Sequence, residues 1–101
     1  MSQILFKLYI AGPTSRSQQA IANLRRLGDE RLGGAYQLVI VDVAENPGIA
    51  ETERILATPT LVKESPLPLR RVTGDLSDLE KVLLVLALPL PRDEIQGKEK
   101  P

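Results

Sequence analysis

The 101-residue chain contains neither cysteine nor histidine. Without cysteine it can form no disulfide, no thiolate nucleophile and no cysteine-ligated zinc site. Without histidine it has no imidazole to act as a general base, which excludes a Ser-His-Asp hydrolase. No other set of side chains forms a convincing catalytic group, so we expect a protein that is not an enzyme and that uses no metal and no cofactor.

Aromatic residues and net charge are also scarce. Phe6, Tyr9 and Tyr36 are the only aromatic residues, too few for a surface on which the bases of single-stranded nucleic acid stack. Thirteen basic and thirteen acidic side chains cancel, so no net field attracts DNA or an anionic membrane. We therefore expect neither nucleic acid nor a membrane as a partner.

No segment is apolar over the length that a membrane-spanning helix requires. The longest apolar run, residues 82–90, is about half of that length. The first residues lack the basic and apolar regions of a signal peptide, so we expect a cytoplasmic protein. By length the chain is one domain, which we place at residues 1–91, followed by a flexible charged tail at 92–101.

The first half of the chain has the pattern of a strand, a helix and a second strand. Residues 4–11 are almost all apolar, which is typical of a buried parallel strand. Thr14 or Ser15 supplies the N-cap of the helix, the latter in a capping box with Gln18. Residues 36–43 form the second strand. Because such crossovers are right-handed, the two strands should be parallel.

Asp42 interrupts the apolar second strand near its carboxyl end. One interpretation is a structural carboxylate that accepts a hydrogen bond from a loop amide. The other is an exposed polar group at the edge where α/β folds bind ligands. The structural interpretation is the more common one for a single acid in this position.

The second half combines short extended runs, prolines and an ambiguous final segment. Asn46 caps a short helix, and the runs at 60–63 and 69–73 flank a proline-rich turn, which predicts an antiparallel hairpin. Ser77 and Glu80 form a capping box for a last helix, whose apolar run also fits the period of a strand. The order β-α-β-α-β-β-α predicts an α/β fold, a single thioredoxin-like domain.

The Thr58-Pro59 step lies directly before the third predicted strand. A thioredoxin-like domain has a cis proline at this place, facing its active site, so we predict a cis bond in this form, while a trans bond stays open for any other arrangement of the second half. A thioredoxin enzyme also has Cys-x-x-Cys at the start of its first helix, where this chain has Gly-Pro-Thr-Ser at residues 12–15. A hydroxyl cannot replace a thiolate in disulfide exchange, so redox activity is excluded.

Several sequence blocks resemble the KaiB family of circadian-clock proteins. In chain order these blocks are residues 7–12 (KLYIAG), 55–61 (ILATPTL), 70–72 (RRV), 74–78 (GDLSD) and 80–83 (EKVL). Together they extend over most of the chain, and the ATPTL and GDLSD blocks are the most specific. The chain is therefore identified as a member of this family.

The resemblance implies a non-enzymatic protein that binds KaiC, a hexameric ATPase and autokinase, and modulates its phosphorylation state in a timing system. It implies KaiA or a sensor histidine kinase as further partners, and a homo-oligomer, a tetramer or dimer, in the ground state. It also implies a fixed N-terminal β-α-β unit and a C-terminal half with two arrangements. That half is either β-β-α, as in thioredoxin, or the KaiB ground-state arrangement, which requires two packings within a few kcal/mol of each other.

The chain also departs from the family pattern. Val85 and Ala87 stand where clock members often have glycine and aspartate, and both raise helix propensity, which predicts a shift toward the thioredoxin-like form. Val39 stands where clock members usually have lysine, so a basic contact is missing. These differences indicate a divergent paralogue working with a divergent KaiC. The alternative is a paralogue with stress-related or chaperone-like partner binding and no clock role.

Two sets of candidate functional residues follow from the resemblance and from exposed charge. The partner-binding candidates are the basic residues Arg54, Lys63, Arg70 and Arg71. The candidate fold-switch junction consists of Thr58, Pro59, Gly74, Asp75, Val85 and Ala87. Each set also has a simpler interpretation: the basic cluster as a solvated hairpin face, and Asp75 with Asp78 as capping residues.

Overall fold

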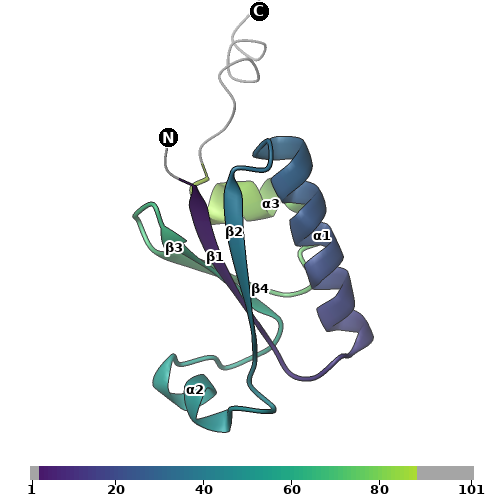
Figure 1. The fold of residues 1–101 in the computed structure, drawn as a ribbon, viewed down its shortest axis with the longest axis vertical. Helices are drawn as coiled ribbons and strands as arrows, with labels where there is room; N and C mark the ends of the chain where they lie inside the picture. The colour runs from purple at the N-terminus through teal and green to yellow at the C-terminus, as the bar shows by residue number, and fades with distance from the viewer. Residues whose placement is uncertain (1–2, 89–101) are drawn as a thin grey trace, which may run out of the picture.

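A four-stranded mixed sheet with strand order β2-β1-β3-β4 organises the molecule (Figure 1). It is seen in a computed structural model that describes residues 3–88. The strands are β1 (Ile4–Ile10), β2 (Tyr36–Asp42), β3 (Thr60–Ser65) and β4 (Arg70–Thr73), and the helices are α1 (Ser15–Arg31), α2 (Pro47–Thr52) and α3 (Leu79–Val85). The predicted order β-α-β-α-β-β-α is confirmed, whereas the tail predicted at 92–101 lies outside the described residues.

The two strand pairings that were predicted, parallel for β1 with β2 and antiparallel for β3 with β4, are confirmed. β1 pairs with β2 in parallel through the α1 crossover, and β3 pairs antiparallel with both β1 and β4. The two edges of the sheet are therefore β2 and β4. Along α1, α2 and α3, no helix in residues 3–88 has the length and apolarity to cross a membrane.

The two faces of the sheet are covered unequally. α1 and α3 cover one face, where the main core gathers around Phe6, Leu8, Leu24, Leu61 and Leu86. Arg31 of α1 and Glu80 of α3 form a salt bridge over this layer. The other face has a smaller cluster of Tyr9, Ile55 and Val62, beside α2. This face is thus covered mainly at the end where α2 lies (Figure 1).

The start of α1 is set by Thr14, one of the two predicted caps. The Thr14 side chain accepts a hydrogen bond from the Ser17 backbone N–H at 3.1 Å, and Ser15 is already the first helical residue. The capping box of Ser15 with Gln18 was therefore wrong. The Ser17 hydroxyl donates to the Gly12 carbonyl at 2.9 Å, which joins the helix start to the turn after β1.

Gly28 allows α1 to approach β2 closely. A Cβ at this position would lie 2.2 Å from Cε1 of Tyr36, well inside van der Waals contact. The Tyr36 ring therefore packs over the helix backbone itself, and its centroid lies 6.2 Å from that of Phe6. Glycine has a low helix propensity, but this contact requires a residue without a side chain.

The last helix differs from the prediction at both ends. Its N-cap is Asp78, which accepts from the Lys81 backbone N–H at 3.2 Å, so the capping box of Ser77 with Glu80 was wrong. α3 ends at Val85, and Ala87 lies beyond it with φ 53°. A left-handed conformation costs a non-glycine residue about 1 kcal/mol. Ala87 therefore does not favour this form through helix propensity, and that prediction was wrong.

Candidate partner-binding site

The turn after β1 and the step before β3 lie at the same end of the sheet. Tyr9 pairs with Thr60 in the β1–β3 ladder, so Pro59 is placed next to the end of β1. The backbone N–H groups of Gly12 and Ala44 donate to the Asp42 carboxylate at 3.0 and 2.9 Å. The structural interpretation of Asp42 is confirmed, because its carboxylate ties together the loops after β1 and β2.

Three of the predicted junction residues come together here. The Thr58-Pro59 bond is cis, as predicted, and the Ser65-Pro66 and Leu67-Pro68 bonds are cis as well. The Gly74 N–H donates to the Pro59 carbonyl at 2.9 Å. Val85 and Ala87 are not part of this group: they lie at the end of α3, where the Ala87 carbonyl is bonded to Lys63 near the other end of β3.

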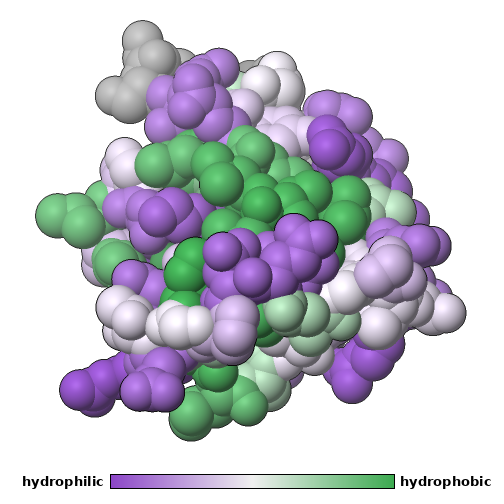
Figure 2. All heavy atoms as spheres, turned by 60° about the horizontal axis from the view of Figure 1, so that its bottom comes forward, coloured by the Kyte–Doolittle hydropathy of each residue, from purple (hydrophilic) through white to green (hydrophobic). Residues whose placement is uncertain are grey.

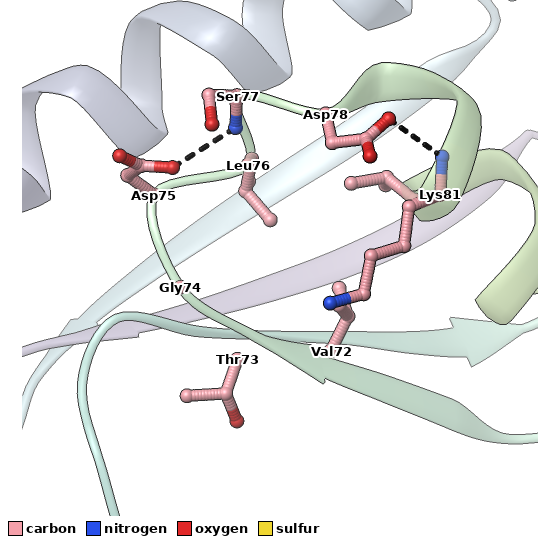
Figure 3. A pocket seen from close by; sticks show the side chains of 9 residues that line it. Val72, Thr73, Gly74, Asp75, Leu76, Ser77, Asp78 and Lys81 are labelled. Atoms are coloured by element: carbon pink, nitrogen blue, oxygen red, sulfur yellow. Dashed lines mark hydrogen bonds between the residues drawn. The ribbon is translucent and has the colours of Figure 1, made fainter.

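The loop after β4 forms a shallow pocket of about 90 Å³ lined by residues 72–78, 81 and 82 (Figure 3). Asp75 accepts from the Ser77 backbone N–H at 3.0 Å, and Asp78 caps α3. Hydrogen bonding from the Ser77 hydroxyl and N–H, with a smaller effect of Arg16, lowers the pKa of Asp75. Both carboxylates therefore have local structural roles and form no acid–base pair: the capping interpretation is confirmed for Asp78, whereas Asp75 stabilises the turn before α3.

Lys63 was predicted to be exposed, and this was wrong. Its residue surface is only 1% exposed, and its ammonium donates to the Ala87 carbonyl at 3.3 Å. Lys63 lies on the same face of β3 as Leu61, under α3, because side chains two residues apart share a face. Burial, with the nearby Arg70 charge, lowers the pKa of the Lys63 ammonium.

The remaining basic candidates divide between the two faces of the edge strand β4. Arg70 is exposed and opposes Lys63, on the α3 side. Arg71 points to the opposite face, where its guanidinium donates to the carbonyl oxygens of Arg54 (3.0 Å) and Glu53 (3.2 Å). The fold therefore brings Arg71 and Arg54 together, while Arg70 and Lys63 lie elsewhere.

Leu56 is a feature of this site that the sequence did not reveal. Its side chain is 97% exposed, although it follows the buried Ile55 in an apolar segment. Figure 2 brings the α2 end of the molecule forward and shows apolar side chains gathered on this face among hydrophilic ones. In the sequence, ILATPTL is uniformly apolar outside its threonines, and nothing in that pattern distinguishes the side chain that points outward.

The fold and this site together define a thioredoxin-like domain that has no thiol. Among solved structures, the N-terminal domain of Synechococcus elongatus SasA matches with a TM-score of 0.70 and 23% identity, over 86% of each chain. Mitochondrial thioredoxin 3 of Saccharomyces cerevisiae matches with a TM-score of 0.64 and 23% identity, over 87% of this chain and 81% of that one. At these identities the similarity establishes the fold alone.

Sequence comparison then gives the family. The KaiB domain model matches residues 7–88. The circadian clock protein KaiB3 of Synechocystis sp. is 54% identical over 85% of this chain and 84% of its own length. The circadian clock oscillator protein KaiB of Synechococcus elongatus is 50% identical over 83% of this chain and 82% of its own. The chain belongs to the KaiB family.

Proposed function

We propose that this protein is a non-enzymatic regulator that binds a KaiC-like ATPase and modulates its phosphorylation state in a timing system. The observation that carries the proposal concerns the end of the sheet where β1 finishes and β3 begins, which we call the thioredoxin-like edge. In a thioredoxin this edge holds the active site, and here it has no reactive group. Gly12-Pro13-Thr14-Ser15 stands where a thioredoxin has its two cysteines. With no thiol, this edge supports binding rather than redox catalysis. Membership of a family of clock proteins supports the same function.

Arg54 supports a partner surface at this edge. Its side chain is exposed at the end of α2, and it makes no salt bridge with any residue in the range 3–88. An unpaired guanidinium on a fixed loop suits a carboxylate on a partner. Arg54 is therefore the direct contact that we retain from the four basic candidates, with Arg70 as an exposed residue outside this edge.

A paralogue rather than an oscillator component fits two observations. Identity is 54% with KaiB3, against 50% and 47% with the oscillator proteins of Synechococcus elongatus and Gloeothece citriformis. Val39, on the edge strand β2, is 44% exposed and brings no charge to that edge. We therefore place a divergent KaiC first among the partners and KaiA or a sensor kinase after it. No observation favours a stress-related or chaperone-like function.

The proposal is tested with the purified protein and the hexameric KaiC homologue of the same organism. We expect the two to co-elute in size-exclusion chromatography and the phosphorylated fraction of the ATPase to change. Arg54→Glu should weaken binding about tenfold or more, since it replaces an attraction by a repulsion. Arg25→Glu, an equal charge change on the exposed face of α1, is the matched control and should bind normally. Failure of the wild-type protein to co-elute would contradict the proposal.

A further inference from the structure

Leu56 projects into solvent from a loop that is held in place on both sides. At 97% exposed it is the most exposed of the large apolar side chains in residues 3–88. The preceding residue, Ile55, is buried with Tyr9 and Val62, and its N–H donates to the Ala50 carbonyl at 2.8 Å. On the other side, the Thr60 hydroxyl donates to the Ala57 carbonyl at 2.7 Å. The exposure of Leu56 is therefore a fixed feature of the fold.

Arg71 holds the same loop from the neighbouring strand. Its guanidinium donates to two consecutive carbonyl oxygens, those of Glu53 and Arg54. Arg54 has φ 56°, a left-handed conformation that a non-glycine residue adopts only when its surroundings enforce it. This turn separates α2 from Ile55 and directs the chain so that Leu56 points outward. The Arg71 side chain therefore supports the conformation of this loop.

A large apolar side chain fixed in water is poor for folding but well suited to binding. Leu56 gains nothing from contacts within the chain, and its burial by a partner would remove apolar surface from water. Because the loop is already ordered, little conformational entropy would be lost on association. The buried centre of an interface is more apolar than its polar rim, so an ordered, exposed apolar side chain is suited to an anchor there.

The charges around Leu56 indicate the chemistry of its partner. Arg54 is exposed without a salt bridge in residues 3–88, and the exposed residues Glu51 and Glu53 precede it directly in the chain. A pocket that receives Leu56 would therefore be apolar and would carry a carboxylate on the side facing Arg54. A second copy of this chain is the other occupant that the test distinguishes.

We propose that Leu56 is the apolar anchor of the partner interface, and that Arg71 is its positioning residue. Leu56 enters an apolar, acid-edged pocket on the KaiC-like ATPase, and Arg71 acts through the loop without direct contact. This inference rests on the proposed function and names an apolar anchor residue for its interface.

The test measures the affinity of the ATPase for wild-type protein, Leu56→Ala and Leu67→Ala. Leu67 is 79% exposed on the β3–β4 turn and provides a matched control. We expect Leu56→Ala to weaken binding about tenfold or more, and Leu67→Ala to change it by less than about twofold. Arg71→Ala should weaken binding in the wild-type background and have little further effect on Leu56→Ala, which a double-mutant cycle measures. Circular dichroism confirms that each variant is folded.

The outcomes separate the anchor from the function it serves. If wild-type protein does not bind the ATPase, the proposed function fails. If wild-type protein binds and Leu56→Ala binds as well, or if both leucine variants lose affinity equally, the anchor is overturned while the function stands. Additive effects of Arg71→Ala and Leu56→Ala would overturn the positioning role. Self-association of the wild-type protein that Leu56→Ala abolishes, with ATPase binding intact, would assign Leu56 to a second copy instead.

Discussion

The side chain of Arg71 on β4 donates a hydrogen bond of 3.0 Å to the backbone carbonyl of Arg54, seventeen residues earlier in the chain. Two basic residues that sequence reasoning placed in one binding set thus have different tasks. Arg71 supports the loop after α2, and Arg54 presents its charge from that loop. The relationship also explains how an exposed arginine can keep a left-handed conformation.

Removing this support should loosen the loop without unfolding the domain. Arg71→Ala eliminates two hydrogen bonds from a charged but exposed donor, so we expect a loss of about 1 kcal/mol in unfolding free energy. Amide exchange at Ile55, Leu56 and Ala57 should become faster, while exchange in β1 stays slow. Exchange mass spectrometry measures both. Unchanged exchange in the loop would show that Arg71 does not hold it.

The contact of Gly28 with Tyr36 should not tolerate a methyl group. Gly28→Ala places a Cβ 2.2 Å from the Tyr36 ring, and we expect overpacking to cost about 1–3 kcal/mol despite the better helix propensity of alanine. Urea unfolding measures the loss. The double variant with Tyr36→Leu should recover part of it, because a smaller side chain leaves room for the methyl group. A Gly28→Ala protein as stable as the wild type would contradict the close packing.

Lys63 should make the stability of the folded domain depend on pH. Its pKa is lowered below the ordinary 10.5 in the folded state, so the unfolded state binds more protons between the two values. Stability therefore rises with pH in that window. Lys63→Met should remove the rise and stabilise the fold at neutral pH by up to about 2 kcal/mol, because a buried charge is replaced by an apolar chain. Urea unfolding from pH 7 to 9.5 tests this.

The upper pH limit of that experiment is set by Tyr9. Burial raises the pKa of the Tyr9 hydroxyl above 10.0, so the folded state retains its proton longer and stability falls as pH rises beyond that value. Below pH 9.5 the contribution of Lys63 is measured with little interference. A pH slope that persists in Lys63→Met would assign the effect to another group.

Asp42 should matter for stability through its acceptor atoms rather than its charge. Asp42→Ala removes the acceptor for the N–H groups of Gly12 and Ala44, and we expect a cost of about 1–3 kcal/mol. Asp42→Asn keeps a carbonyl oxygen in the same place and should cost less than half of that. Thermal or urea unfolding distinguishes them. Equal losses in the two variants would show that the negative charge is what matters.

The fold was largely predictable because most of its elements have one clear pattern. Three patterns each predict a single structure: the apolar run of β1, the helical spacing in α1 and the proline-rich turn before β4. The cis bond at Pro59 followed from the thioredoxin-like order of the elements. Sequence-level capping identified the correct region but missed the residue at Asp78, since Ser77 and Asp78 both have suitable side chains.

The site was less predictable because burial is decided by tertiary packing. Lys63 has a long apolar stem, and its position under α3 depends on which face of β3 the helix covers. Leu56 has the opposite problem: its side chain favours burial, but the turn at Arg54 points it outward. Neither the burial of Lys63 nor the exposure of Leu56 is encoded in local propensity or spacing.

The central claim is that this thioredoxin-like edge binds a KaiC-like ATPase. The most direct measurement is a calorimetric titration of the full-length protein into the hexameric ATPase, repeated with Arg54→Glu and with Arg25→Glu. We predict saturable binding that Arg54→Glu weakens about tenfold or more and Arg25→Glu leaves unchanged. Absence of binding by the wild-type protein, or equal affinity of Arg54→Glu and wild type, would contradict this account.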